Sequence, residues 1–240
     1  MSHELSEQEI VRRESLTKLK DLGINPYPAE LFPVNTLSTE IDNNYEEGKQ
    51  VIVAGRLMSR RIMGKASFAE IQDSEGRIQI YINRDVICEG EDKTLYNDVF
   101  KKLVSLGDII GIKGFAFITR TGEKTIHVKE FVLLSKVLRP IIFPKIEDDG
   151  TVHDTLTDTE QRYRQRYLDM IIHPDVRKVF RRRTKMYTAF REFLDSKGYL
   201  EVETPILQPL YGGAAARPFK THHNSLDTTL YLRIANELYL

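Results

Sequence analysis

The sequence is short of cysteine, of long apolar runs and of net charge. Its single cysteine, Cys88, excludes an internal disulfide framework and a cysteine-rich zinc site, and predicts a buried thiol in a reducing, cytoplasmic setting. No apolar run approaches the roughly 20 residues that span a bilayer, and the polar N-terminus has no features of a secretory signal. Basic and acidic residues balance at 35 each, so bulk charge does not indicate nucleic-acid binding. A length of 240 residues predicts one or two domains.

The first 50 residues predict one helix and a connector. Ser6 and Glu9 fit a capping box, and Gly23 fits the stop signal after the helix. The basic residues of this helix are interpreted as a solvated face, or alternatively as an auxiliary RNA contact. Apolar residues recur at roughly helical spacing: Ile10, Leu16, Leu19 and Leu22.

From Val51 the apolar period changes to two, which is typical of strands. A helix is predicted between the third and fourth strands, because Tyr96, Val99, Phe100, Leu103 and Val104 follow helical spacing. Three strands, a helix and two strands is the order of an OB-fold, a five-stranded barrel that commonly binds single-stranded nucleic acid. The predicted strands are Val51–Met58, Ala66–Asp73, Arg77–Asn83, Asp108–Thr119 and Thr125–Ser135.

The alternation also predicts which side chains face outward. With Ile78, Ile80 and Ile82 inside, Gln79 and Tyr81 lie outside, and on the second strand Phe68 and Glu70 do the same. A base can stack on an exposed ring, and a neighbouring amide can read its edge. The alternative is a phenylalanine packed under a loop or against the second domain. Arg56 is the predicted third member, because its planar group suits stacking or phosphate.

The second half of the chain predicts a helix and a sheet. Residues 140–160 are interpreted as an irregular linker, with Pro144 and the acidic turn Glu147–Gly150. Between Glu160 and Arg191 there are ten basic and three acidic residues, which fit a solvated helix face or a phosphate-attracting one. A long helix with an apolar stripe ends at Gly198, and Gly198–Ile206 is predicted as a strand cut by Pro205. The stripe comprises Val179, Phe180, Met186, Tyr187, Phe190, Phe193 and Leu194.

Two features near the end of the chain suggest a binding site. The small residues of Tyr211–Ala216 permit close approach of a ligand or another chain, although a plain loop is the favoured interpretation of this stretch taken alone. Glu237 lies among apolar neighbours, where a carboxylate without a partner is unfavourable. The alternative is a glutamate in the first turn of a helix capped by Asn236.

Several segments of the sequence, taken in order, resemble those of a known protein family. VETPIL, GGAAARPFKTHHNSLD and YLRIANELYL resemble the start of the catalytic domain of class II lysyl-tRNA synthetases, as does RYRQRYLDMI. VAGRLMSRRIMGKASFAEIQDSEGRIQIYI resembles the anticodon-binding domain shared by lysyl, aspartyl and asparaginyl enzymes. The resemblance implies a β-barrel plus an α+β part: an OB-fold anticodon-binding domain followed by the start of a class II antiparallel-sheet catalytic domain. The expected boundaries are 1–50 for the N-terminal helix and connector, 51–139 for the barrel, 140–160 for the linker and 161–240 for the partial catalytic domain.

The resemblance also implies roles for particular residues. Phe68 and Gln79 would recognise the central anticodon uridine of tRNA-Lys with help from Arg56, and Glu123 would add a further contact. In the catalytic part, Gly213 would line the amino-acid site and Glu237 would bind lysine. Asn236 replaces the proline of many relatives but leaves Glu237 in register. Pro205 and the preceding helix would form a homodimer interface.

The implied parent activity joins lysine to ATP and then to tRNA, with Mg²⁺. The two arginines that the family uses to hold ATP lie in later motifs that are not among these 240 residues, so the chain by itself is expected to be inactive. The alternative from another class is a non-catalytic OB-fold module for RNA binding and dimerisation, which has no need of Glu237. Aspartyl or asparaginyl specificity is disfavoured by GGAAARPF and IANELYL. Enzymes that lysylate elongation factor P are disfavoured because they lack the N-terminal barrel.

Overall fold

The computed structural model describes residues 4–141, 143, 145–146, 152–153 and 156–240. The chain divides into two units, Met1–Leu168 and Asp169–Leu240, and each is described by itself. The predicted turn at Glu147–Gly150 and the prediction at Pro144 lie outside the described residues. Within the predicted linker, β6 (Lys145–Ile146) pairs with β7 (Val152–His153). The predicted linker thus contains one short pair of strands, which supply each other with backbone partners.

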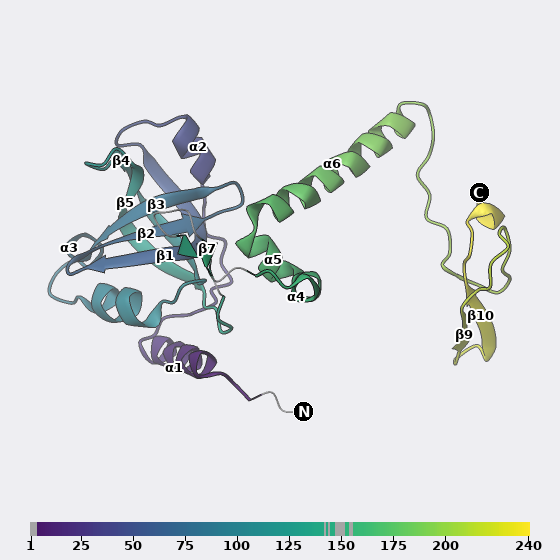
Figure 1. Ribbon diagram of the computed structural model, residues 1–240, viewed down its shortest axis with the longest axis horizontal. Helices are drawn as coiled ribbons and strands as arrows, with labels where there is room; N and C mark the ends of the chain where they lie inside the picture. Colours follow the sequence, from purple (N-terminus) through teal and green to yellow (C-terminus); the bar gives the residue numbers. More distant parts are fainter. Residues whose placement is uncertain (1–3, 142, 144, 147–151, 154–155) are drawn as a thin grey trace. The chain divides into compact units, whose positions relative to one another are not determined.

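The first unit contains a closed barrel with the strand order β1-β2-β3-β5-β4 (Figure 1). All pairs are antiparallel except β3 with β5. This is the predicted OB-fold, and β1 continues five residues beyond its predicted end. The strands are β1 (Gln50–Met63), β2 (Ala66–Gln72), β3 (Arg77–Asn83), β4 (Ile109–Ile118) and β5 (Lys124–Ser135), and the short helices α2 (Ser38–Asn43) and α3 (Arg84–Ile87) flank them.

The inside and outside of the barrel follow the predicted alternation. On β3, Ile78, Ile80 and Ile82 are at most 4% exposed, whereas Gln79 and Tyr81 between them are only partly buried. On β2, Ala69 and Ile71 are buried in the same core. Burial of apolar side chains at about 25 cal/mol per Å² drives this arrangement, and it places Gln79, Tyr81 and their neighbour Phe68 on the outer surface.

The helix predicted between β3 and β4 is η1 (Leu95–Leu103), and it is a π-helix. Its last bond runs from the amide of Val104 to the carbonyl of Val99, five residues back, at 2.8 Å. Arg60 of β1 binds the end of this helix: its Nη1 donates to the carbonyls of Phe100 and, at 3.0 Å, Val104. A cation at a helix C-terminus stabilises carbonyls that lack helical partners.

The N-terminal helix α1 (Glu7–Asp21) has the predicted capping box. The amide of Ser6 donates to Glu9 Oε2 at 3.0 Å, and the amide of Glu9 donates to Ser6 Oγ at 3.3 Å. The predicted apolar stripe is only partly correct: Leu19 is fully buried in the barrel core, but Ile10 and Leu22 are nearly half exposed. Helix α1 packs against η1, and its buried residues are Glu9, Ser15 and Leu19, of which only Leu19 belongs to the predicted stripe.

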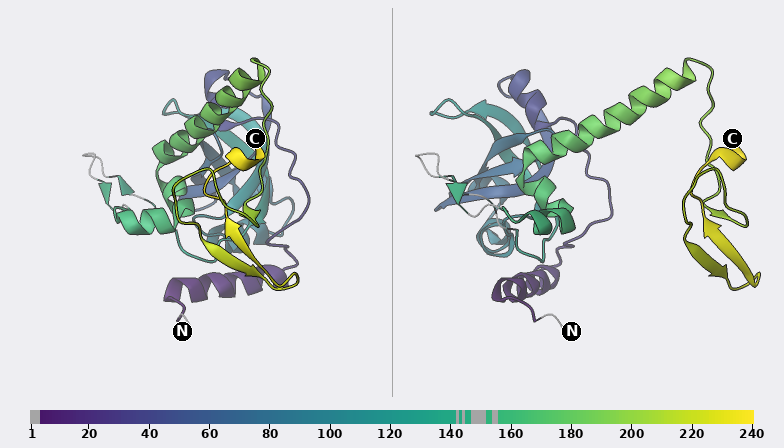
Figure 2. Two further views of the ribbon diagram at one scale, coloured as in Figure 1. Left: turned by 90° about the vertical axis from the view of Figure 1, so that its right-hand side faces the viewer. Right: turned by 45° about the vertical axis from the view of Figure 1, so that its right-hand side comes forward.

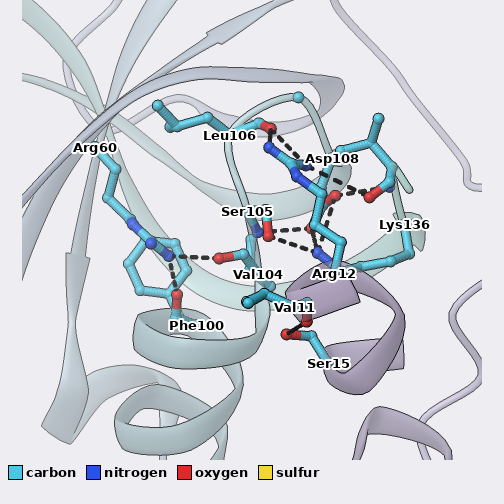
Figure 3. Close-up of polar contacts among 12 residues, drawn as sticks. Val11, Arg12, Ser15, Arg60, Phe100, Val104, Ser105, Leu106, Asp108 and Lys136 are labelled. Carbon is cyan, nitrogen blue, oxygen red and sulfur yellow. Dashed lines mark hydrogen bonds and ion pairs between the residues drawn. The ribbon is translucent and has the colours of Figure 1, made fainter. Parts of the chain in front are cut away.

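The segments that follow η1 and β5 meet at a buried ion pair between Asp108 and Lys136, and Arg12 of α1 binds beside it (Figure 3). Lys136 Nζ lies 3.0 Å from Asp108 Oδ2, and both side chains are fully buried. The amides of Ser105 and Val137 also donate to the Asp108 carboxylate, each at 2.8 Å. From α1, Arg12 Nη1 donates to the carbonyls of Leu106 and Val137 at 3.2 and 3.4 Å. A buried charge requires partners of this kind, so Asp108 organises this end of the barrel.

The second unit carries a long helix and a small antiparallel sheet. The predicted helix is α6 (Pro174–Asp195), which both views in Figure 2 show as one uninterrupted helix. The sheet has the order β8-β10-β9, consistent with the antiparallel prediction. The remaining elements are α4 (Thr159–Arg164), α5 (Arg166–Ile172), β8 (Leu207–Gln208), β9 (Lys220–His223), β10 (Thr228–Leu232) and the 3₁₀ turn η2 (Glu237–Tyr239), of which α4 and part of α5 belong to the first unit.

The strand predicted over Gly198–Ile206 is absent, and pairing begins only at Leu207. Apolar alternation alone does not make a strand, because the backbone also needs a neighbouring ladder, and Pro205 has no N–H to offer one. In place of a strand partner, the amide of Arg233 donates to the carbonyl of Ile206 at 2.8 Å, and the guanidinium of Arg233 donates to the carbonyl of Thr204 at 2.7 Å. No helix in the described part of the chain is both long and apolar enough to cross a membrane.

Candidate nucleic-acid interface

The outer face of the barrel carries a concavity of about 1160 Å³. Its floor comes from β1, β2 and β3, and one wall comes from the loop between β4 and β5. The concavity contains three of the four predicted anticodon-contacting residues, Phe68, Gln79 and Glu123. The sequence prediction that Phe68 and Gln79 share the outer face is therefore confirmed, and Glu123 lines the same concavity.

Phe68 and Gln79 are held in defined positions. The Phe68 ring lies 5.1 Å from the Tyr81 ring, its cross-strand partner, at a tilt of 49°. Gln79 Nε2 donates to Thr125 Oγ1 at 3.1 Å. The hydroxyl of Thr125 donates its proton to the carbonyl of Glu123 at 3.2 Å, so towards Gln79 it can only accept. The NH₂ group of Gln79 must therefore face Thr125, which fixes the orientation of the amide. Gln79 Oε1 has no hydrogen bond to any described residue, so it is available as an acceptor in the concavity.

Arg56 does not lie with these residues. Its position on β1 pairs with Gln72, and its Nη1 donates to the carbonyl of Gly107 at 2.7 Å. Burial lowers the pKa of Arg56, and nearby Asp108 offsets part of this effect. The structure thus assigns Arg56 to the closed end of the barrel around Asp108.

The arginine that the structure brings to Phe68 is Arg61. These two residues are directly paired between β1 and β2, and both line the concavity. Arg61 is exposed and makes no hydrogen bond or ion pair with any residue that the structure describes, which leaves its donors free for a ligand. Sequence reasoning missed it because β1 was predicted to end at Met58. The cross-strand register, counted back from Phe68, would have revealed it.

Gly213 and Glu237, the two residues expected at the amino-acid site, lie together. Gly213 has a φ of +87°, and a Cβ at this position would lie 2.9 Å from Glu237 Oε2 and 2.9 Å from Ala235 Cβ. Only glycine accommodates both the backbone conformation and the carboxylate. The argument from an apolar environment does not hold, because the Glu237 side chain is exposed in the described chain. Asn236 does not cap η2; its Oδ1 accepts from Thr204 Oγ1 at 3.1 Å.

The residues expected at a dimer interface are exposed. Pro205 is exposed, and the apolar stripe of α6 is between 36 and 61% exposed along its whole length. An apolar stripe of this size is unusual on a soluble surface. Elsewhere in the described residues, no three histidine, cysteine, aspartate or glutamate side chains gather as they would around a metal ion. Cys88 is buried and free, as predicted.

Two family models match the chain in the same order as the two predicted domains. Residues 51–134 match the OB-fold nucleic acid binding domain of the tRNA anticodon family, and residues 158–240 match the class II tRNA synthetases for D, K and N. The barrel and the antiparallel sheet thus match two domains found in class II tRNA synthetases.

Three similar relatives share the name of one enzyme, lysine–tRNA ligase. Lysine–tRNA ligase from Christiangramia forsetii is 62% identical over 237 residues, which is 99% of this chain and 42% of the relative. The enzyme of the same name from Porphyromonas gingivalis is 57% identical over 242 residues and is covered to 42%, and that from Azobacteroides pseudotrichonymphae is 56% identical over 239 residues and is covered to 48%. The chain is similar to lysine–tRNA ligases over nearly its whole length, and it spans less than half the length of these relatives.

Proposed function

We propose that the whole protein ligates lysine to tRNA-Lys in the cytoplasm, using ATP and Mg²⁺, and that this chain reads the anticodon and contributes to a homodimer. The main support is the grouping of Phe68, Gln79 and Glu123 in one concavity of an OB-fold. In this proposal Arg61 replaces Arg56 as the assisting arginine. A non-catalytic RNA-binding module would use the same concavity, but it gives no reason for the contact between Gly213 and Glu237.

The fixed amide of Gln79 suggests how a uridine is selected. A base stacked on Phe68 would present its Watson–Crick edge to Gln79 Oε1, which is a free acceptor. Uridine carries an N–H at that edge, whereas cytidine carries an unprotonated nitrogen that would repel the oxygen. A buried polar group left without its partner costs about 1–3 kcal/mol, so the site would prefer uridine in the centre of the anticodon.

Phe68→Ala is expected to weaken binding of a UUU anticodon stem-loop by roughly 5- to 100-fold, because a base stacked on an aromatic ring contributes about 1–3 kcal/mol. The measurement is a fluorescence-anisotropy titration of the chain at one stated salt concentration, since phosphate contacts make affinity salt-dependent. A stem-loop with central cytidine is the ligand control and should bind the unaltered chain more weakly. Equal affinity for both loops, together with an unaffected Phe68→Ala variant, would refute the anticodon proposal.

Lysine activation is proposed for the whole protein and not for these 240 residues. Gly213 and Glu237 would hold the amino acid, with the carboxylate of Glu237 facing the lysine ammonium. ATP would supply the adenylyl group that joins the lysine carboxylate as pyrophosphate leaves, and Mg²⁺ would neutralise phosphate charge. We expect no lysine-dependent ATP–pyrophosphate exchange by the chain alone. The check is a standard exchange assay with a full-length relative as positive control, and exchange clearly above background would contradict the expectation.

The exposed stripe of α6 supports self-association. We expect the chain to form dimers through Val179–Pro205, because an isologous contact would bury the stripe against itself. The measurement is light scattering over a concentration series, with Phe190→Glu as the disrupting variant and Glu130→Lys, on the barrel, as the control. A monomer at high concentration, or equal behaviour of both variants, would count against this interface.

A further inference from the structure

The aromatic surface of the barrel does not end at Phe68. Tyr81 lies beside Phe68, stacks on His127 with ring centroids 5.2 Å apart, and meets the edge of Phe117 at 6.1 Å. These rings come from four different strands and form a continuous row. Burial lowers the pKa of His127, and Lys129 adds to this effect, so the ring that supports Tyr81 is neutral at physiological pH.

Only part of this row is open to a ligand. Phe68, Tyr81 and Phe117 line the concavity. Phe115, two residues before Phe117 on the same face of β4, packs against His127 at 4.9 Å and does not line the concavity. The Nζ of Lys129 lies 5.3 Å from the centre of the Phe115 ring and covers it. Among the described residues, no cation lies over the rings that line the concavity.

The space and charge beside Phe117 suit a second nucleotide. At about 1160 Å³ the concavity exceeds the roughly 300–1,000 Å³ of pockets for drug-sized ligands, so one base on Phe68 does not fill it. Arg120, in the loop that follows β4, lines the same end. Like Arg61, it makes no polar contact with any described residue, which leaves two guanidinium groups available for phosphates.

We propose that Phe117, supported by Tyr81, is a second stacking platform that binds the base next to the central uridine of the anticodon loop. This proposal rests on the function proposed above. It makes Phe117 a determinant of loop binding in its own right. A ring stacks on any base, so Phe117 would add affinity for an unstacked loop while Gln79 provides selection at the central position.

The experiment titrates five chains against three RNAs. The chains are unaltered, Phe117→Ala, Phe117→Leu, Phe117→Tyr and Phe115→Ala. The RNAs are the UUU stem-loop and two versions in which the first or the third anticodon nucleotide is abasic. Phe117→Ala and Phe117→Leu are expected to weaken binding of the intact loop by roughly 5- to 100-fold, whereas Phe115→Ala changes it by less than about twofold. Phe117→Leu keeps apolar volume, so a loss in both variants reports the missing ring and not a folding defect.

The abasic loops separate stacking from indirect effects. For one of the two, replacement of Phe117 should no longer matter, because the base that it would bind is already missing. Phe117→Tyr should restore tight binding of the intact loop. Equal losses on all three RNAs, or no loss on the intact loop, would overturn the proposal. If the unaltered chain fails to distinguish central uridine from cytidine, the anticodon proposal itself fails, which is a different result.

Discussion

Replacing Asp108 with alanine is expected to lower the free energy of unfolding by about 3–5 kcal/mol, because removal of one partner leaves a buried charge uncompensated. Lys136 Nζ would retain only Ser105 Oγ, at 2.7 Å, and its ammonium is fully buried. The amides of Ser105 and Val137 would lose their acceptor as well. The measurement is urea unfolding followed by circular dichroism.

Two variants give this prediction its controls. Glu130→Ala removes the partner of Lys113 in an exposed pair, whose side chains are 60 and 41% exposed, and should cost no more than about 1 kcal/mol. Asp108→Ala combined with Lys136→Met should be more stable than Asp108→Ala alone, because no uncompensated charge remains. Equal losses for Asp108→Ala and Glu130→Ala would show that the buried pair contributes little.

Gly114→Ala is expected to cost more than about 3 kcal/mol and to prevent folding of much of the protein. A Cβ at Gly114 would overlap the carbonyl oxygen of His127 and lie 2.9 Å from its carbonyl carbon. Both are backbone atoms within the β4–β5 ladder, and Gly114 sits where its register shifts. Neither strand can move away without losing hydrogen bonds, so the clash persists.

Gly48→Ala is the matched control for this substitution. Gly48 has open space around its missing Cβ, but its φ is +78°, so the cost is limited to the backbone conformation, about 1–2 kcal/mol. Thermal unfolding of both variants compares a steric clash with conformational strain. Any Gly114→Ala protein that folds should also bind the stem-loop poorly, because a displaced His127 no longer supports Tyr81. Equal stability of the two variants would contradict the steric argument.

The class of fold was predictable because its signals are local. The capping box at Ser6 involves residues three apart, and the alternation that buries Ile78, Ile80 and Ile82 depends only on the period of an extended chain. Phe68 and Gln79 followed from the same alternation. The resemblance of the motifs to lysyl-tRNA synthetases was equally local, and the comparisons confirmed it.

The misplaced arginine shows where local signals fail. Arg56 and Arg61 are both on β1, but the register of β1 against β2 shifts between Leu57 and Ser59. This irregularity and the length of β1 decide which arginine meets Phe68. Similarly, Gly198–Ile206 has the apolar character of a strand but no ladder partner among the described residues, since pairing starts at Leu207.

The sequence by itself thus determined the order of the strands, the faces of the barrel and the family, because these depend on spacing along one chain. Only the tertiary structure decided that Arg61 lines the concavity, that Asp108 gathers Lys136 and the backbone around it, and that Phe117 joins Tyr81. Those contacts join residues distant in sequence. Their partners are set by strand register, by the bulges in β1 and β5, and by closure of the barrel, none of which is encoded in a local pattern.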